Sequence, residues 1–250
     1  MTEFKIKLAD KVIGVKAINP STQTFCRKYT VSDNETCDLL VELCPDDIQR
    51  EREKSYAEDD FEGKERRQFS DEYLETLALY RKIADGICEL DVLLFHGSVI
   101  SVDGEGYLFT AKSGTGKSTH TRLWRQLLGD RAVMVNDDKP LISVSNDGKV
   151  TVYGTPWCGK HGLGDNINAN LRAICIIERA PENSIVRVDP ISVYPLLLQQ
   201  TYRSSHPSKL MVTLPLLDRM LKSVAVFKLG CNMEKEAAEV SYTAMSGKEI

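Results

Sequence analysis

The sequence predicts an α/β fold with a mixed, strand-rich sheet and a small β-rich lobe at the N-terminus. Three observations support this prediction. Short apolar segments with β character far outnumber helical segments between residues 91 and 153. A glycine-rich segment, Ala111–Thr119 (AKSGTGKST), separates a strand-like segment from a helix-like one. Strands and helices do not alternate regularly, so we expect a mixed sheet instead of a parallel one.

Composition sets broad limits on the class of protein. The chain has 250 residues, of which 42% are hydrophobic, and can therefore bury a large core. Its 32 basic and 36 acidic residues are interspersed and leave a net charge of −4, which gives no reason to expect a nucleic acid or an anionic membrane as partner. No segment approaches the ~18 consecutive apolar residues of a spanning helix, and no signal peptide is recognisable. We therefore expect a cytoplasmic protein whose seven widely spaced cysteines are reduced.

The chain divides into two expected parts, a small lobe at residues 1–69 and a larger domain at residues 70–250. In the lobe, alternating apolar residues predict a hairpin around Ala9 and Asp10. The highly charged segment 46–67 lacks an apolar stripe and predicts an exposed helix that runs into a loop. The strands of the lobe are expected at residues 4–8, 12–18, 24–31 and 37–43.

In the larger domain, Ser70 is a suitable N-cap for an amphipathic helix, and Asn146-Asp147-Gly148 predicts a hairpin turn. Pro195 and Pro215 weaken the helical pattern of the segments that contain them. The expected strands lie at residues 93–95, 99–102, 107–111, 132–135, 141–144, 150–153, 173–178 and 225–229. The expected helices lie at residues 70–87, 117–128, 191–202, 209–222 and 234–245.

The glycine-rich segment fits a phosphate-binding loop, G-x-x-x-x-G-K-[ST], except that Ala111 stands where the first glycine normally lies. Gly114 and Gly116 would let backbone N–H groups turn toward phosphate oxygens, and the following helix would direct its positive dipole end at the same anion. Lys117 would bridge the β and γ phosphates, and Ser118 would offer its hydroxyl to Mg²⁺. The expected nucleotide-binding residues are Ser113, Gly114, Thr115, Gly116, Lys117, Ser118 and Thr119.

Two carboxylates follow the strand at 132–135, in the segment Asn136-Asp137-Asp138. One carboxylate could hold Mg²⁺, and the other could accept a proton from an attacking hydroxyl. Two acids at the end of a strand, seen alone, more often form a solvated turn. Their position after a phosphate-binding loop favours the catalytic interpretation.

The segment His96–Val144 resembles the catalytic core of HPr kinase/phosphorylase, which shares its fold with phosphoenolpyruvate carboxykinase. The matching features are a His-Gly pair that opens a strand, a turn containing Gly104 and Gly106, the glycine-rich loop and the Asp-Asp pair. The resemblance implies a P-loop phosphotransferase core of this type. It also implies that Asp137 acts as the catalytic base, that Asp138 is the carboxylate on the metal side, and that His96 lies near this pair.

The following segment, residues 154–178, is more similar to kinase-like relatives encoded beside lasso-peptide and other biosynthetic genes. Studied members of that group phosphorylate a serine hydroxyl, and relatives commonly assemble into oligomers. The resemblance to the superfamily covers about residues 91–230. By itself, His96 is also consistent with a structural histidine.

A polar, glycine-rich loop at residues 154–170 is long enough to be a binding loop or lid. Lys160 is the most suitable residue there to neutralise a phosphate or carboxylate, and a plain surface excursion is the alternative. A second cationic segment, residues 201–209, could bring a positive charge to the site. The expected substrate-binding residues are Thr155, Trp157, Lys160, Asn166 and Arg203.

Together these features predict an ATP-dependent kinase that uses Mg²⁺, or Mn²⁺, and transfers the γ-phosphoryl group to a hydroxyl. The acceptor would be a serine-like small molecule or a serine of a peptide or protein. Two alternatives use the same nucleotide site. One is a carboxykinase-like reaction on a keto acid, and the other is a nucleotide-sensing module without catalysis.

Overall fold

A computed structural model describes residues 1–250 and divides them into two compact units, Met1–Ile87 and Cys88–Ile250. The expected boundary lay before the helix α3 (Asp71–Ile87), whereas the units divide after it. The reason is packing: α3 contacts α1 (Pro20–Phe25), β3 (Leu39–Glu42) and α2 (Pro45–Phe61) of the first unit. No helix of the structure combines the length and the apolar character needed to cross a membrane.

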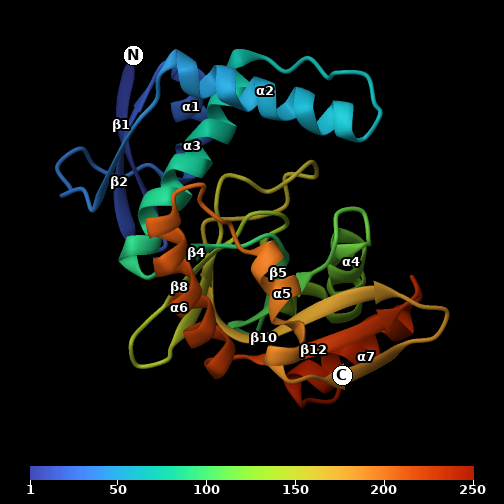
Figure 1. The fold of residues 1–250 in the computed structure, drawn as a ribbon. Helices are drawn as coiled ribbons and strands as arrows, with labels where there is room; N and C mark the ends of the chain where they lie inside the picture. Colours follow the sequence, from blue (N-terminus) through green and yellow to red (C-terminus); the bar gives the residue numbers. More distant parts are fainter. The chain divides into compact units, whose positions relative to one another are not determined.

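The first unit contains a three-stranded sheet in the order β1-β2-β3 (Figure 1). As expected, β1 (Thr2–Leu8) and β2 (Lys11–Ala17) form an antiparallel hairpin, and Ala9 and Asp10 turn with positive φ angles of 49° and 61°. β3 pairs with β2 in parallel. The strand expected at residues 24–31 is wrong, because α1 and a short 3-10 helix, η1 (Arg27–Tyr29), occupy most of that segment.

The charged segment of the first unit forms α2, as expected, but the side of this helix that packs inward carries acids. Asp47, Glu51 and Asp59 are all buried. Lys82 pairs with Asp47 at 2.7 Å, and Arg81 pairs with Glu51 at 2.8 Å. The buried side of α2 is therefore held by ion pairs, which explains why the sequence shows no apolar stripe there.

The second unit is built on a nine-stranded mixed sheet with the main order β4-β8-β9-β10-β6-β5-β7, to which β12 adds beside β10 and β11 beside β12. β11 is a strand that the sequence pattern did not reveal. The strands are β4 (Val92–Leu94), β5 (Ser98–Val102), β6 (Glu105–Thr110), β7 (Ala132–Asn136), β8 (Leu141–Val144), β9 (Val150–Tyr153), β10 (Asn168–Arg179), β11 (Ser184–Arg187) and β12 (Ala225–Cys231). The helices are η2 (Cys88–Leu90), α4 (Lys117–Leu128), η3 (Gly129–Arg131), α5 (Pro190–Gln200), α6 (Pro207–Ser223) and α7 (Lys235–Ser246).

Helices cover both faces of this sheet (Figure 1). Because successive side chains of a strand point to opposite faces, Leu108 packs with α5 and α6, while its neighbours Tyr107 and Phe109 pack with α4 and α7. α5 and α6 continue through their internal prolines, so both helices exist where they were expected. Each face thus contributes one hydrophobic core.

Strand direction determines where the polar residues meet. β5 is antiparallel to both of its neighbours, β6 and β7. β10 is parallel to β6, and β12 is parallel to β10. The last residues of β12, β10, β6 and β7 therefore lie at the same edge of the sheet as the first residue of β5.

Candidate active site

The glycine-rich loop leaves this edge at the end of β6 and leads directly into α4. Gly114 and Gly116 have positive φ angles of 76° and 125°, and a Cβ atom at either position would meet no atom within 4 Å. The glycines are therefore needed for backbone conformation and not for close packing. Gly116 is the N-cap of α4, and no side chain caps the first turn. The positive end of the helix dipole thus points into an open part of the site.

Lys117, the first residue of α4, is buried, and its Nζ donates a hydrogen bond to the carbonyl oxygen of Ala111 at 3.3 Å. Burial lowers the pKa of this amine, and the nearby Lys139 lowers it further, whereas Asp138 and Asp137 oppose the shift. An anion that approached the amine would stabilise its charged form. The lysine is thus a cation held in place before any ligand arrives.

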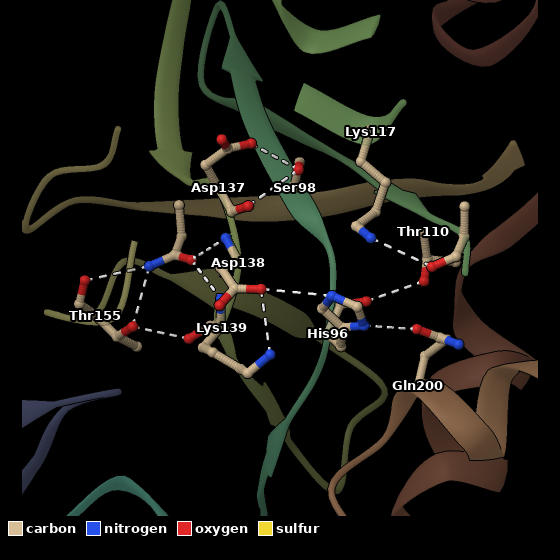
Figure 2. Close-up of polar contacts among 11 residues, drawn as sticks. His96, Ser98, Thr110, Lys117, Asp137, Asp138, Lys139, Thr155 and Gln200 are labelled. Atoms are coloured by element: carbon tan, nitrogen blue, oxygen red, sulfur yellow. Dashed lines mark hydrogen bonds and ion pairs between the residues drawn. The ribbon is translucent and has the colours of Figure 1, made fainter. Parts of the chain in front are cut away.

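Asp137 follows β7 and is nearly buried. Its Oδ1 accepts a hydrogen bond of 2.7 Å from the hydroxyl of Ser98, which also lies 3.2 Å from the backbone oxygen of Asp137 (Figure 2). Ser98 is the first residue of β5, and its own burial is complete. The carboxylate is thus oriented by a neutral donor from the neighbouring strand.

The turn that carries Asp138 is built by Asn136. The Oδ1 atom of Asn136 accepts hydrogen bonds from the backbone N–H groups of Asp138 at 2.8 Å and Lys139 at 2.7 Å. Its Nδ2 donates to the hydroxyl of Thr155 at 3.0 Å, and that hydroxyl donates to the carbonyl of Lys139 at 2.8 Å (Figure 2). Thr155 is fully buried in this network. It lies behind the turn and supports it.

His96 lies just before β5 and is fixed by Gln200, the last residue of α5 (Figure 2). Its Nδ1 lies 2.9 Å from Gln200 Oε1, and its backbone N–H donates to the Gln200 carbonyl at 2.7 Å. Burial, together with Lys139 and Lys117, lowers the pKa of His96 to about 4. The contact of 3.4 Å between His96 Nε2 and Asp138 Oδ1 therefore involves a neutral imidazole and is not an ion pair at neutral pH.

These groups surround a cavity of about 410 Å³. Its walls include His96, Lys117, Asp137 and Asp138. The loop contributes Ser113, Gly114, Gly116, Ser118 and Thr119. The segment after Trp157 closes the far side, where Gly159, Lys160 and His161 line the cavity. A Cβ atom on Gly159 would lie 3.1 Å from Asp138 Cβ, so this segment passes directly against the acid.

The structure brings some of the residues expected in the site together and places others away from it. Lys160 is on the cavity wall, whereas Trp157 is buried and does not line the cavity. Asn166 and Arg203 are exposed and do not line it either. The sequence analysis did not identify Ser98 and Gln200. Ser98 could have been identified, because it lies two residues after His96 at the start of the same strand.

Comparisons with known proteins identify no family for this chain. No protein-family model matches the chain, and no curated protein matches it. One solved structure to which the chain is similar is described as the HPr(Ser) kinase/phosphatase from Coxiella burnetii. The TM-score is 0.33 at 10% sequence identity, and the match covers 62% of this chain and 95% of that chain. The likeness is distant, so any function must be argued from the site itself.

Proposed function

We propose that this protein is an ATP-dependent kinase that transfers the γ-phosphoryl group to a hydroxyl. One observation carries the proposal: the uncapped start of α4 with the buried Lys117 faces the same cavity as Asp137, which Ser98 holds in place. An anion site and a carboxylate base in one cavity are two parts that phosphoryl transfer needs.

The loop and Lys117 are proposed to bind the phosphates of the nucleotide. Residues 113–119 supply backbone N–H groups around Gly114 and Gly116, and the dipole of α4 favours negative charge at this end. Lys117 gives up its contact with the Ala111 carbonyl, which is long at 3.3 Å, and turns to the phosphate oxygens. Its depressed pKa returns toward the ordinary value when it gains this partner.

Asp137 is proposed to accept the proton of the acceptor hydroxyl. The Ser98 bond occupies one side of Oδ1, so the carboxylate is presented to the cavity in a defined orientation. His96 is neutral and held by Gln200, and it limits the positions open to Asp138. The acceptor hydroxyl would thus meet its base within the cavity that the loop lines.

The residues present fit a magnesium ion that is shared with the nucleotide. No group of three or more His, Cys, Asp or Glu side chains in the structure could hold a metal by itself. Ser118 and Asp138 both line the cavity and offer hard oxygen ligands, and Mg²⁺ commonly takes one or two such ligands plus substrate phosphates. When bound, the ion would neutralise charge on the phosphates. Mn²⁺ has similar ligand preferences.

The acceptor is proposed to be a serine-like small molecule or a serine of a peptide or protein. Lys160 and His161 line the cavity together with Asp137. A side chain with a hydroxyl can enter this space between the acid and the loop. We also propose that copies of the chain assemble, and a measurement of the molar mass in solution tests this.

Radiolabelled transfer tests the proposal. The purified chain is incubated with γ-labelled ATP, Mg²⁺, and free serine, threonine, glycerol or a seryl peptide. We expect label on at least one acceptor, a loss of at least 100-fold in Lys117→Ala and Asp137→Asn, and retained ATP binding in Asp137→Asn. Lys112→Ala is the matched control, because Lys112 lies in the same loop but is exposed and does not line the cavity.

Two results would each indicate a different function. ATP binding without transfer to any acceptor and without hydrolysis indicates a nucleotide-sensing module. Formation of phosphoenolpyruvate from oxaloacetate and nucleotide indicates a carboxykinase. Wild-type transfer by Asp137→Asn would show that Asp137 is not the base.

A further inference from the structure

The glycine-rich loop borders a second cavity, of about 480 Å³, on its other side. Gly114, Gly116 and Thr119 line both cavities. The first cavity lies toward the start of β5 and the end of β7, and the second lies toward the ends of β10 and β12. The loop therefore separates two spaces, and a molecule whose phosphates lie on the loop can extend into both.

The second cavity has different chemistry from the first. Leu123, Ile177 and Met233 provide apolar walls, and no Asp, Glu or Lys lines it. Its one charged lining residue is Arg179, whose guanidinium donates to the carbonyls of Gly114 at 2.6 Å and Thr115 at 3.3 Å. This arginine is thus engaged in fixing the loop. Cavities of about this volume with mostly apolar walls and few polar groups are typical of small-molecule and cofactor sites.

One buried polar group of this cavity has no partner. His120 is 2% exposed and lines the cavity, and its Nδ1 makes no hydrogen bond. Its Nε2 lies 2.9 Å from the hydroxyl oxygen of Ser241. That oxygen also receives the indole N–H of Trp124 at 2.8 Å and lies 2.8 Å from the carbonyl of Ala237.

The Ser241 hydroxyl thus holds the ring of His120 in the wall of the cavity. Because Nδ1 itself is buried, a ligand in the cavity meets the ring and not this atom.

We propose that the second cavity holds the base and ribose of the donor nucleotide. This inference rests on the proposed kinase function and assigns the direction of the nucleotide. The base lies between Leu123 and Met233, the phosphates cross the loop, and the γ-phosphate enters the first cavity beside Asp137.

A cavity-filling variant tests the placement of the base. Binding of ATP and of inorganic tripolyphosphate is measured by calorimetry on the full chain, since tripolyphosphate has the phosphates but no base. We expect Ala180→Trp, on the wall of the second cavity, to weaken ATP binding at least tenfold and to leave tripolyphosphate binding unchanged. Leu123→Trp, from the opposite wall, provides a second variant if the first does not fold. Equal losses for both ligands, or no loss for either, would overturn the inference.

The same binding measurements distinguish this inference from the proposed function. A wild-type chain that binds neither ATP nor tripolyphosphate, or a Lys117→Ala chain that binds both normally, would instead refute the proposed kinase function.

Discussion

Ser98 donates its hydroxyl hydrogen to Asp137 Oδ1 over 2.7 Å, from one strand of the sheet to the end of the next. The register of β5 and β7 pairs Val99 with Asn136, which places Ser98 beside Asp137. Both side chains are buried. The proposed base is therefore oriented by a neutral hydrogen-bond donor from the neighbouring strand.

Replacing Ser98 tests this relationship. Ser98→Ala removes the donor and allows the Asp137 carboxylate to rotate, so we expect the turnover of phosphoryl transfer to fall about tenfold with little change in nucleotide binding. Hydrogen bonds to charged groups are typically worth about 1.5–3 kcal/mol. Ser101→Ala is the control, because Ser101 lies on the same strand and is buried but makes no contact with Asp137. A similar loss of turnover in both variants would show a general effect on the strand.

Gly159 and Gly162 form a matched pair on the segment that closes the first cavity. Both have positive φ angles, 67° and 61°, so alanine at either position is strained by about 1 kcal/mol. Only at Gly159 does the added Cβ meet Asp138, at 3.1 Å, whereas at Gly162 it meets nothing within 4 Å. We expect Gly159→Ala to lower turnover and metal-dependent nucleotide binding several-fold and Gly162→Ala to preserve both. Equal kinetics in the two variants would show that this segment does not position Asp138.

The buried His120 makes the stability of the second unit depend on pH. Burial lowers its pKa from 6.5 to about 4, so between these values the unfolded chain binds more protons than the folded chain. Stability is therefore complete above pH 6.5 and decreases as the pH falls toward 4, by about 2 kcal/mol from this residue between pH 7 and pH 5. Urea unfolding followed by tryptophan fluorescence reports on this unit, because Trp124 and Trp157 both lie in it. His120→Phe should unfold with a clearly shallower pH dependence, and an unchanged slope would contradict the assignment.

Glu75 is the polar centre of the first unit. It is fully buried on α3, and its carboxylate accepts hydrogen bonds from the backbone N–H groups of Ile18 and Asn19 and from the side chains of Asn19 and Thr22. Glu75→Leu leaves these donors unsatisfied, so we expect the first unit to lose about 3 kcal/mol of stability. Hydrogen exchange of the amides at residues 18–22 should rise strongly. The exposed Glu72, one turn earlier on the same helix, is the control as Glu72→Leu, and equal exchange in the two variants would contradict the role of Glu75.

Local patterns were sufficient for most elements of the fold. β8 and β9 begin and end at the predicted residues, and the Asn146–Gly148 turn joins them. The prediction of a strand at 24–31 failed because distant contacts determine the structure of this segment. Pro20 starts a helix there, and Glu75 from α3 binds the residues at its beginning. The sequence pattern did not reveal β11 because the strand is mostly exposed and its pairing partner, β12, lies far along the chain.

The sequence by itself determined which groups could do chemistry here, because a glycine-rich turn before a helix and two acids after a strand are local patterns with a direct physical meaning. Only the tertiary structure decided which of them meet. β6, β5 and β7 lie side by side, and this brings the loop, His96 and Asp137 to one edge of the sheet. The same packing brings Ser98 to Asp137 and Gln200 to His96, and it places Thr155 outside the cavity. These hydrogen-bond partners are distant in sequence, so only the folded chain brings them together.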